Sequence, residues 1–459
     1  MSSSFIYEKV YIDIKEKILN GTYKENHKLP SIRNLSTSAG ISKNSVIHAY
    51  ELLEIEGLIY SDYRNGYFVS RIDPLNKSIK NMDSHEKDIH EALPLKYDFS
   101  FSGVGNKYFD YKNLGLSFKN TINSKDMDII SQDDPKGSYN LRYSIKKHLS
   151  AARNIHIDED QIIIAPGSYE LLMIVRLIFP NKVFGFENPS YQYTSNSIFI
   201  NIDNLPMDIS TNGVIVRNID RRIDLPVVTP ARQFPLTYFM DYHTRVSLLN
   251  WANEKDSRYI IENDYDAEFK YKLDKIYPLM AMDINDKVIY FGNFSRTISP
   301  AVRISYMVLP KHIVREHDDK LQILRCSVSN FVQEAVSYFI DRGYFEKQVN
   351  RMRVLYSRKY DFIMEKLKDS NYIKILSTNP GISFVIETIP VDNTILIKNL
   401  REKGVKIKPI NGYTYDKKGY ENKFLIGFAK LDFKQIDKGL DIIIQEVKKL
   451  SWLNLFCNN

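Results

Sequence analysis

Apolar residues recur at helical spacing through the first 56 residues, and small residues mark where helices should begin or end. The spacing predicts helices over residues 5–19, 31–39 and 42–56. Gly40 should end the second helix, and the hydroxyl of Ser42 should cap the third. We therefore expect three short helices joined by tight turns.

Two short β-rich runs, residues 58–60 and 67–69, follow the third helix. Asn65 and Gly66 lie between them and supply the positive φ that a tight hairpin turn needs. Three helices followed by a hairpin is the plan of a winged helix-turn-helix domain, in which one helix enters the major groove of DNA.

The predicted third helix has an apolar face and a polar face. Val46, Ala49, Tyr50 and Leu53 recur on one side and are expected to pack inward. The polar side chains left on the opposite face are those of Lys43, Asn44, Ser45 and His48.

The same region resembles the DNA-binding domain of the GntR family of transcription regulators. The resemblance is carried by Leu-Pro-Ser-Ile-Arg-Asn-Leu at residues 29–35, Ile-Ser-Lys-Asn-Ser-Val at residues 41–46 and Arg-Asn-Gly-Tyr-Phe-Val at residues 64–69. It implies that Asn44 and His48 are candidate base readers. The other residues that it places at phosphates or bases are Arg33, Ser42, Lys43, Ser45, Arg64 and Gly66.

The charge of this region leaves a second interpretation open. Residues 1–70 carry eight Lys or Arg and eight Asp or Glu, so the predicted domain has no net charge. A neutral domain should bind non-specific DNA weakly, so useful operator affinity should need a dimer. From the residues alone, the polar face could instead be a solvated surface of a helix-turn-helix that does not meet DNA.

The rest of the chain predicts a linker and a larger domain. Residues 71–95 are polar and charged without a sustained period, which is typical of a connector. From residue 97 onwards helical and β-rich segments alternate, which predicts an α/β sheet with crossover helices. We expect a DNA-binding domain over residues 1–70, then the linker, then a large domain over residues 96–459.

Residues 290–310 have the pattern of a strand, a polar loop and a second strand, a common setting for binding residues. Ser295, Arg296 and Arg303 lie in the loop. The stretch resembles the cofactor-binding segment of MocR-type regulators and, through them, of fold-type I aminotransferases that bind pyridoxal phosphate. That resemblance implies a mainly parallel sheet, a homodimer, and a cofactor phosphate held by Arg303 and Ser295.

Further segments of the large domain carry the same resemblance. They are Asp-Pro-Lys-Gly-Ser-Tyr-Asn-Leu-Arg at residues 134–142, Glu-Asn-Pro-Ser-Tyr at residues 187–191 and Glu-Asn-Asp-Tyr-Asp at residues 262–266. The cofactor contacts that the resemblance implies are Gly167 and Ser168 at the phosphate, where a helix begins, Tyr191 and Tyr265 on the ring, and Asn263 at the ring nitrogen.

Two of these residues depart from the family pattern. Arg296 stands where the family has the lysine that forms a Schiff base with the cofactor, and Asn263 replaces the aspartate that pairs with the protonated ring nitrogen. A guanidinium stays protonated, so it cannot form the Schiff base, but its planar fork holds carboxylate or phosphate well. A neutral amide does not stabilise a protonated ring as a carboxylate does. The family's usual histidine is also replaced, by Arg232.

We therefore expect a transcription regulator, not an enzyme, whose aminotransferase-like domain senses a small anionic ligand read by Arg296 and Arg232. Three alternatives stay open. Pyridoxal phosphate could be held without a covalent bond, or replaced by another ligand. The large domain could act only as a dimerisation scaffold. The chain could be an aminotransferase with a fused DNA-binding domain, although Arg296 argues against it.

Composition narrows the class of protein. A length of 459 residues exceeds one ordinary domain, and 43% hydrophobic with 26% charged residues is typical of soluble globular proteins. The net charge of +7 is spread along the chain and adds little to the prediction of a nucleic-acid partner. Two cysteines exclude a disulfide framework, and no apolar run suits a signal peptide or membrane span, so we expect a cytoplasmic location.

Overall fold

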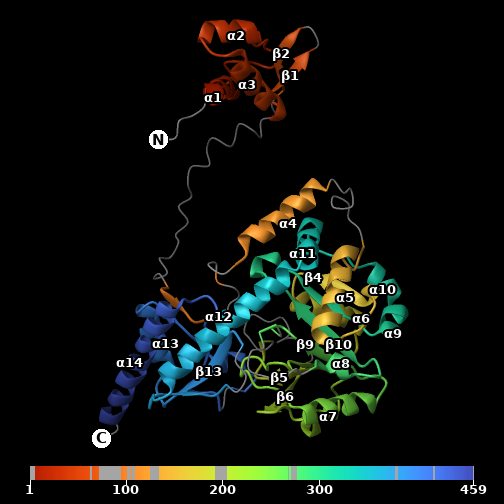
Figure 1. Cartoon of the computed structure of the whole chain (residues 1–459), viewed down its shortest axis with the longest axis vertical. Helices are drawn as coiled ribbons and strands as arrows, with labels where there is room; N and C mark the ends of the chain where they lie inside the picture. Colours follow the sequence, from red (N-terminus) through yellow and green to blue (C-terminus); the bar gives the residue numbers. More distant parts are fainter. Residues whose placement is uncertain are drawn as a thin grey trace. The chain divides into compact units, whose positions relative to one another are not determined.

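The computed structural model describes residues 6–62, 65–71, 95–100, 105, 109–124, 134–191, 204–266, 268–269, 277–377, 381–416 and 419–457, with backbone alone for residues 452–457. The chain divides into two compact units, Met1–Glu91 and Ala92–Asn459, called here the head and the body (Figure 1). The expected linker, apart from its ends, lies outside the described residues.

The head contains the predicted three helices and hairpin. Its elements are α1 (Ile6–Leu19), α2 (Ile32–Ala39), α3 (Lys43–Ile55), β1 (Ile59–Asp62) and β2 (Gly66–Val69). The Ser31 hydroxyl accepts a hydrogen bond from the Asn34 N–H (3.2 Å) and caps α2. The Ser42 hydroxyl likewise accepts from the Ser45 N–H (3.1 Å) and caps α3. Gly40 ends α2 in the left-handed conformation, so these predictions are confirmed.

Tyr50 lies at the centre of the core of the head. Its side chain is fully buried, and its hydroxyl donates a hydrogen bond to the Pro30 carbonyl (2.8 Å). Its ring meets that of Tyr67 in β2 edge to face, with 4.9 Å between ring centroids. The other residues of the predicted inward face, Val46, Ala49 and Leu53, are also fully buried. One side chain therefore joins α3 to the start of α2 and to the hairpin.

The body is built on an eight-stranded sheet in the order β4-β11-β10-β9-β8-β5-β6-β7 (Figure 1). Neighbouring strands from β10 to β6 are parallel, whereas β11 is antiparallel to both its neighbours and β7 to β6. The expected mainly parallel sheet is confirmed. The strands are β4 (Ile162–Ala165), β5 (Phe184–Asn188), β6 (Asn204–Ser210), β7 (Gly213–Val214), β8 (Leu225–Val228), β9 (Ile260–Asn263), β10 (Val288–Asn293) and β11 (Ser305–Val308).

Helices cover both faces of this sheet because side chains along a strand alternate in direction. In β4, Ile163 packs in one core with α6, and Ile164 packs in another with α5 and α11. The helices and 3-10 turns of this part are α4 (Tyr111–Asn123), α5 (Tyr139–Arg153), η4 (Glu159–Gln161), α6 (Ser168–Ile178), η7 (Val216–Asn218), α7 (Tyr242–Asn253), α8 (Leu279–Met282), η8 (Pro300–Val302), α9 (Lys311–Glu316), α10 (Asp318–Gln322) and α11 (Asn330–Asp341).

A smaller lobe is built on an antiparallel sheet in the order β12-β13-β16-β15. The first strand of the body, β3, belongs to this lobe: Tyr97 pairs with Val405 of β14, and Phe99 is fully buried in the core of the lobe. The elements are β3 (Tyr97–Asp98), α12 (Tyr344–Leu367), β12 (Ile373–Ile375), β13 (Ser383–Thr388), α13 (Asn393–Glu402), β14 (Val405–Lys406), β15 (Lys408–Pro409), η9 (Ile410–Tyr413), β16 (Lys423–Gly427) and α14 (Phe433–Cys457).

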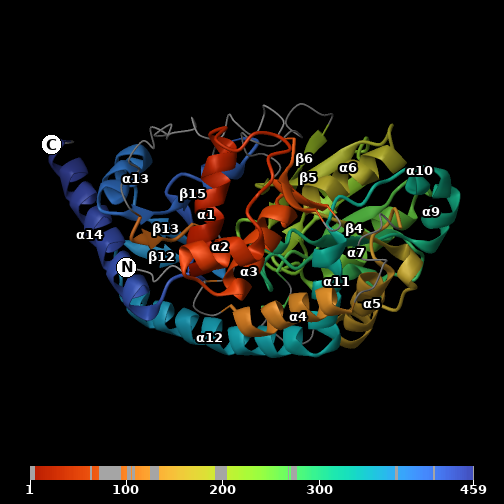
Figure 2. The ribbon, with the colours of Figure 1, turned by 90° about the horizontal axis from the view of Figure 1, so that it is seen from above.

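Helix α12 joins the two parts of the body. Near its start, Phe345 and Val349 pack in the core that contains α5 and α11. Further along, Tyr356 and Ile363 pack in the core of the smaller lobe. Figure 2 shows α12 as one long helix that runs from α11 towards α14. Among the described residues, no helix has both the length and the apolar character to cross a membrane.

Candidate functional site

The polar face of α3 is accessible to solvent, as the sequence predicts. Lys43, Asn44 and His48 are exposed, and Ser45 is partly exposed. A shallow hollow on this face is lined by Tyr7, Asn44, Ser45, Ile47, His48 and Glu51. The structure therefore brings these four predicted DNA-binding residues together on one helix surface.

Three of the predicted DNA-binding residues in or next to α3 have neighbours that the sequence analysis missed. His48 Nδ1 lies 3.4 Å from a carboxylate oxygen of Glu51, and the His48 ring meets Tyr7 edge to face at 4.6 Å. The Ser42 and Ser45 hydroxyl oxygens lie 2.8 Å apart, so the helix cap holds both side chains. The three-residue spacing between His48 and Glu51 on a helix was the signal for the first pair.

The remaining predicted DNA-binding residues lie outside α3. Arg33 is exposed on α2, and Gly66 is exposed at the start of β2 with a φ of +105°, as expected for the hairpin turn. Arg64 lies outside the described residues.

The predicted cofactor-binding residues of the body gather at one edge of the large sheet. Strands β9 and β10 are parallel and end at Asn263 and Asn293, and the loop over residues 294–304 follows β10. Gly167 follows the end of β4, which has the same direction because both β4 and β10 are antiparallel to β11. These residues therefore share the carboxyl edge, where α/β sheets commonly bind ligands.

Arg296 lies in that loop among one carboxylate and three phenols. Burial lowers the pKa of Arg296 to about 10, although the charge of Asp266 and the phenols of Tyr265, Tyr191 and Tyr413 act in the opposite direction. The guanidinium therefore remains a cation at neutral pH. Together these five residues are called here the Arg296 site.

The three tyrosines of the Arg296 site surround one phenylalanine. The Phe234 ring lies edge to face with Tyr413 (5.2 Å), Tyr265 (6.0 Å) and Tyr191 (6.2 Å), measured between ring centroids. Tyr191 is 62% exposed, whereas burial raises the pKa of Tyr265 well above its ordinary value. These rings can flank a planar or apolar group.

Arg232 is paired with the carboxylate of the Arg296 site. Its buried guanidinium forms an ion pair with Asp266 (2.5 Å) and donates to the backbone carbonyl of Phe269 (3.2 Å). The charge of Arg232 is thus balanced inside the protein. Both Arg232 and Arg296 act on the carboxylate of Asp266, and the expectation that they read an anionic ligand stays a prediction.

Asn263 lies at the end of β9, beside the Arg296 site in sequence and in the sheet. Its side-chain oxygen Oδ1 is buried and has no hydrogen-bond partner among the described residues. A buried acceptor without a partner is costly, and a ligand that donates a hydrogen bond to it would remove the cost.

Buried charged residues from distant parts of the chain form a network that includes Asp264 and Glu268, on either side of Asp266 in the sequence. The sequence analysis missed this network. Arg153 of α5 donates to a carboxylate oxygen of Glu268 (2.8 Å) and lies 3.9 Å from Asp264, which accepts a hydrogen bond from the Tyr290 hydroxyl (2.8 Å). His148 lies 3.8 Å from Glu268. No local pattern connects these residues, because more than a hundred positions separate Arg153 from Glu268.

At the predicted phosphate end, Gly167 is the N-cap of α6 and Ser168 its first residue. Ser295 is partly exposed in the loop. Arg303 has a left-handed backbone (φ 49°, ψ 49°), and its side chain is 62% exposed. A guanidinium nitrogen of Arg303 lies 3.6 Å from a carboxylate oxygen of Glu170, an acidic residue that the sequence analysis did not consider.

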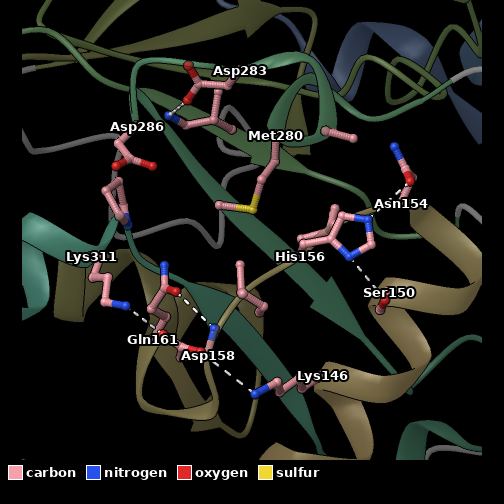
Figure 3. A pocket seen from close by; sticks show the side chains of 15 residues that line it. Lys146, Ser150, Asn154, His156, Asp158, Gln161, Met280, Asp283, Asp286 and Lys311 are labelled. Atoms are coloured by element: carbon pink, nitrogen blue, oxygen red, sulfur yellow. Dashed lines mark hydrogen bonds and ion pairs between the residues drawn. The ribbon is translucent and has the colours of Figure 1, made fainter.

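A cavity of about 650 Å³ lies at the opposite edge of the large sheet (Figure 3). Its lining includes Gln161 just before β4, Val288 at the start of β10 and Pro310 after β11. Lys146 and Lys311 line it too, and both lie within ion-pair distance of Asp158 (3.7 and 2.7 Å). None of the predicted site residues lines this cavity.

Both units of the chain are similar to known proteins. Residues 6–69 match the family described as bacterial regulatory proteins, gntR family. The whole chain is 31% identical over 443 residues to the uncharacterized HTH-type transcriptional regulator YdeL of Bacillus subtilis (strain 168), covering 95% of each chain. It is 23% identical over 459 residues to the probable rhizopine catabolism regulatory protein MocR of Rhizobium meliloti, covering 95% of this chain and 92% of MocR. The chain is a MocR-like member of the GntR family.

The body of this MocR-like regulator has the fold of an aminotransferase. It resembles the crystal structure of Pyrococcus horikoshii kynurenine aminotransferase with a TM-score of 0.69 and 21% identity, covering 81% of this chain and 96% of that one. Identity at this level shows the fold alone. Membership of the GntR family makes the protein a DNA-binding transcription regulator that binds operator DNA through its head.

Proposed function

We propose that this regulator senses a small anionic ligand at the Arg296 site and does so without transaminase chemistry. The observation that carries the proposal is the cationic Arg296 among Asp266 and three tyrosines, in the loop that follows β10. A guanidinium offers a planar pair of N–H donors to a carboxylate, whereas it has no free amine to attack an aldehyde. Ligand binding would then shift the population of DNA-binding states.

The residues of the site do not fit pyridoxal phosphate as a covalently held cofactor. Arg296 replaces the amine that would attach it, and Asn263 offers a neutral amide to its ring nitrogen. Binding of pyridoxal phosphate without a covalent bond is the second candidate, supported by the buried acceptor of Asn263 and by Arg303 at the other end of the loop. Both candidates describe a regulator and not an aminotransferase.

On the DNA side, we propose that the exposed residues of α3, together with Arg33 and Gly66, contact the operator. As the head has no net charge over residues 1–70, its affinity should depend on two heads acting together, which a homodimeric body would provide.

The first experiment is a titration of the purified protein with pyridoxal phosphate, followed by borohydride reduction and mass spectrometry. We expect no trapped adduct on the peptide that contains Arg296, because a guanidinium does not form a reducible Schiff base. Arg296→Lys, at saturating pyridoxal phosphate, is the comparison that provides an amine. A trapped adduct on that peptide in the natural protein contradicts the proposal.

Ligand sensing is tested separately, by fluorescence anisotropy of operator DNA in the presence of small carboxylates. Arg296→Met keeps an unbranched apolar stem and removes the guanidinium with its charge. We expect ligands to change operator affinity in the natural protein and not in Arg296→Met, with equal affinity of the two in the absence of ligand. If no carboxylate has an effect, the body is a scaffold for dimerisation.

For the head, Lys43→Ala should weaken binding to all DNA sequences and lower the slope of log affinity against log salt by about one per head. The reason is that a lysine at the start of α3 contacts phosphate as a point charge. Asn44→Ala should instead change sequence preference, by about 1–3 kcal/mol at one base pair, and leave the slope unchanged. Anisotropy titrations over a range of salt distinguish the two, and an unchanged slope in Lys43→Ala would remove it from the phosphate contacts.

A further inference from the structure

One face of the sheet in the smaller lobe packs against the aromatic rings of the Arg296 site. Val385 of β13 pairs with Leu425 of β16, which pairs in turn with Lys408 of β15. Residues directly opposite in an antiparallel sheet have their side chains on the same face, so these three share one face. Val385 and Leu425 belong to a small core against which the ring of Phe234 packs. Lys408 therefore lies on the face that meets the rings around Phe234.

The segment that follows Lys408 contributes directly to the site. It continues into η9, which ends at Tyr413, one of the three tyrosines of the Arg296 site. The Tyr413 carbonyl accepts a hydrogen bond from the N–H of Ser190, just after β5 (2.8 Å). The Tyr415 N–H donates to Oδ1 of Asn188, at the end of β5 (2.9 Å). These two hydrogen bonds hold the segment against the carboxyl edge of the large sheet.

The amine of Lys408 makes no hydrogen bond or ion pair within the described part of the chain, although the side chain is partly buried. Burial lowers the pKa of Lys408, and the charges of Lys406 and Arg296 act in the same direction, against the charge of Asp98. An anion bound beside the amine would reverse this effect. Arg296 acts on Lys408 more weakly than Lys406 does, as expected for two cations that lie apart.

We infer that Lys408 is a second ligand-binding cation of the Arg296 site and that the ligand of the regulator is a small dicarboxylate. The planar fork of Arg296 would hold one carboxylate, the amine of Lys408 would hold the other, and the rings around Phe234 would flank the body of the ligand. A ligand with one carboxylate, held by Arg296, would leave the amine of Lys408 without a counter-charge. The inference deepens the proposed function and rests on it for the place of the sensing site.

The test is isothermal titration of the full-length protein with isophthalate and terephthalate, each compared with benzoate. The three acids share a planar ring, and the first two add a second carboxylate at different positions. In the natural protein, we expect the better dicarboxylate to bind at least about tenfold more tightly than benzoate, as for one added hydrogen bond between charged groups. Lys408→Met should lower its affinity to that of benzoate and leave benzoate binding unchanged.

Lys406→Met is the matched control, because it removes the same charge two residues away, in β14, where Lys406 pairs with Asp98 of β3. This variant should keep the preference for the dicarboxylate. Lys408→Arg keeps a cation at the position and should retain part of the preference. Lys408→Gln is the second variant, used if Lys408→Met fails to fold, and urea unfolding followed by fluorescence checks all variants.

Equal affinity of the natural protein for benzoate and for both dicarboxylates overturns the inference. So does an equal loss of dicarboxylate binding in K406M and K408M, since the effect then comes from positive charge in this region in general. A loss of benzoate binding in K408M as large as the loss of dicarboxylate binding also overturns it, because a single carboxylate then contacts Lys408.

Failure of the proposed function has a different signature in the same titrations. Arg296→Met would then bind benzoate as tightly as the natural protein does, or none of the three acids would bind at all, and the inference would fall with the proposed function. If the inference alone fails, benzoate binding still depends on Arg296, and only the preference for a second carboxylate is absent.

Discussion

Replacing Arg153 by Met is expected to destabilise the body by about 3–5 kcal/mol, the usual result of removing one partner from a buried ion pair. The Arg153 side chain is 8% exposed and lies against the carboxylates of Glu268 (2.8 Å) and Asp264 (3.9 Å). Methionine would fill much of the same volume but leave both carboxylates without their main cation. The loss of stability should therefore come mainly from the uncompensated charges and less from lost packing.

The lowered pKa of Glu268 supports the expected loss of stability. Burial alone would raise the pKa of Glu268, but Arg153 and then His148 outweigh burial and bring it to about 2, below its ordinary value of 4.5. A carboxyl with a lowered pKa contributes stability above its unfolded value, and that stability is lost as pH falls through the folded value. In Arg153→Met, the stability that ionised Glu268 contributes should be lost near neutral pH, and not only at acidic pH.

Urea unfolding followed by tryptophan fluorescence measures this effect in the body alone, because the two tryptophans of the chain, Trp251 and Trp452, both belong to the body. Arg222→Met is the control at an exposed arginine and should leave the unfolding midpoint unchanged. Arg153→Met combined with Glu268→Gln should recover part of the loss, since it removes one of the stranded charges. A single variant within about 1 kcal/mol of the natural protein would contradict the expectation.

Replacing Tyr50 by Ala is expected to unfold the head and abolish specific operator binding. The side chain is fully buried and joins α3, the Pro30 carbonyl and Tyr67. Truncation of a buried aromatic residue costs about 3–5 kcal/mol. A domain of this size has a total stability of about the same magnitude, so little would remain.

Anisotropy with operator DNA and the fluorescence of the body together test this prediction. Operator binding should be lost, whereas the urea midpoint reported by the tryptophans should not change, as both tryptophans lie in the other unit. Tyr50→Phe is the matched control: it removes only the hydrogen bond to Pro30, at a cost of about 1 kcal/mol, and should still bind. Full operator affinity in Tyr50→Ala would show that the head does not depend on this residue.

The head could be predicted from the sequence because its signals are local. Ser42 caps α3, Gly40 ends α2, and the inward face of α3 follows from helical periodicity, all within a few residues of each other. In the body, the alternation of helical and β-rich segments along the sequence also predicts a sheet with crossover helices. Helix α5 (Tyr139–Arg153) begins where a local signal places it, because the hydroxyl of Ser138, just before it, provides the cap.

The parts that could not be predicted depend on residues distant in the chain. Arg232 was expected to face a ligand, but its pair with Asp266, which lies 34 positions further on, exists only once the strands are assembled. The Arg153 network is of the same kind. Glu170 differs from these residues because an acid three residues after the N-cap Gly167 could be seen in the sequence. Its contact with Arg303, in contrast, could be found only in the structure.

The pairing of β3 with β14 has a mechanical consequence. The chain that leaves the head enters the body at β3, so its anchor point is the smaller lobe and not the large sheet. The loop with Arg296 follows β10 of the large sheet, whereas Tyr413 belongs to η9 of the smaller lobe. A ligand held by both would fix the angle between the two lobes, and with it the position of β3, where the chain enters the body, relative to the large sheet.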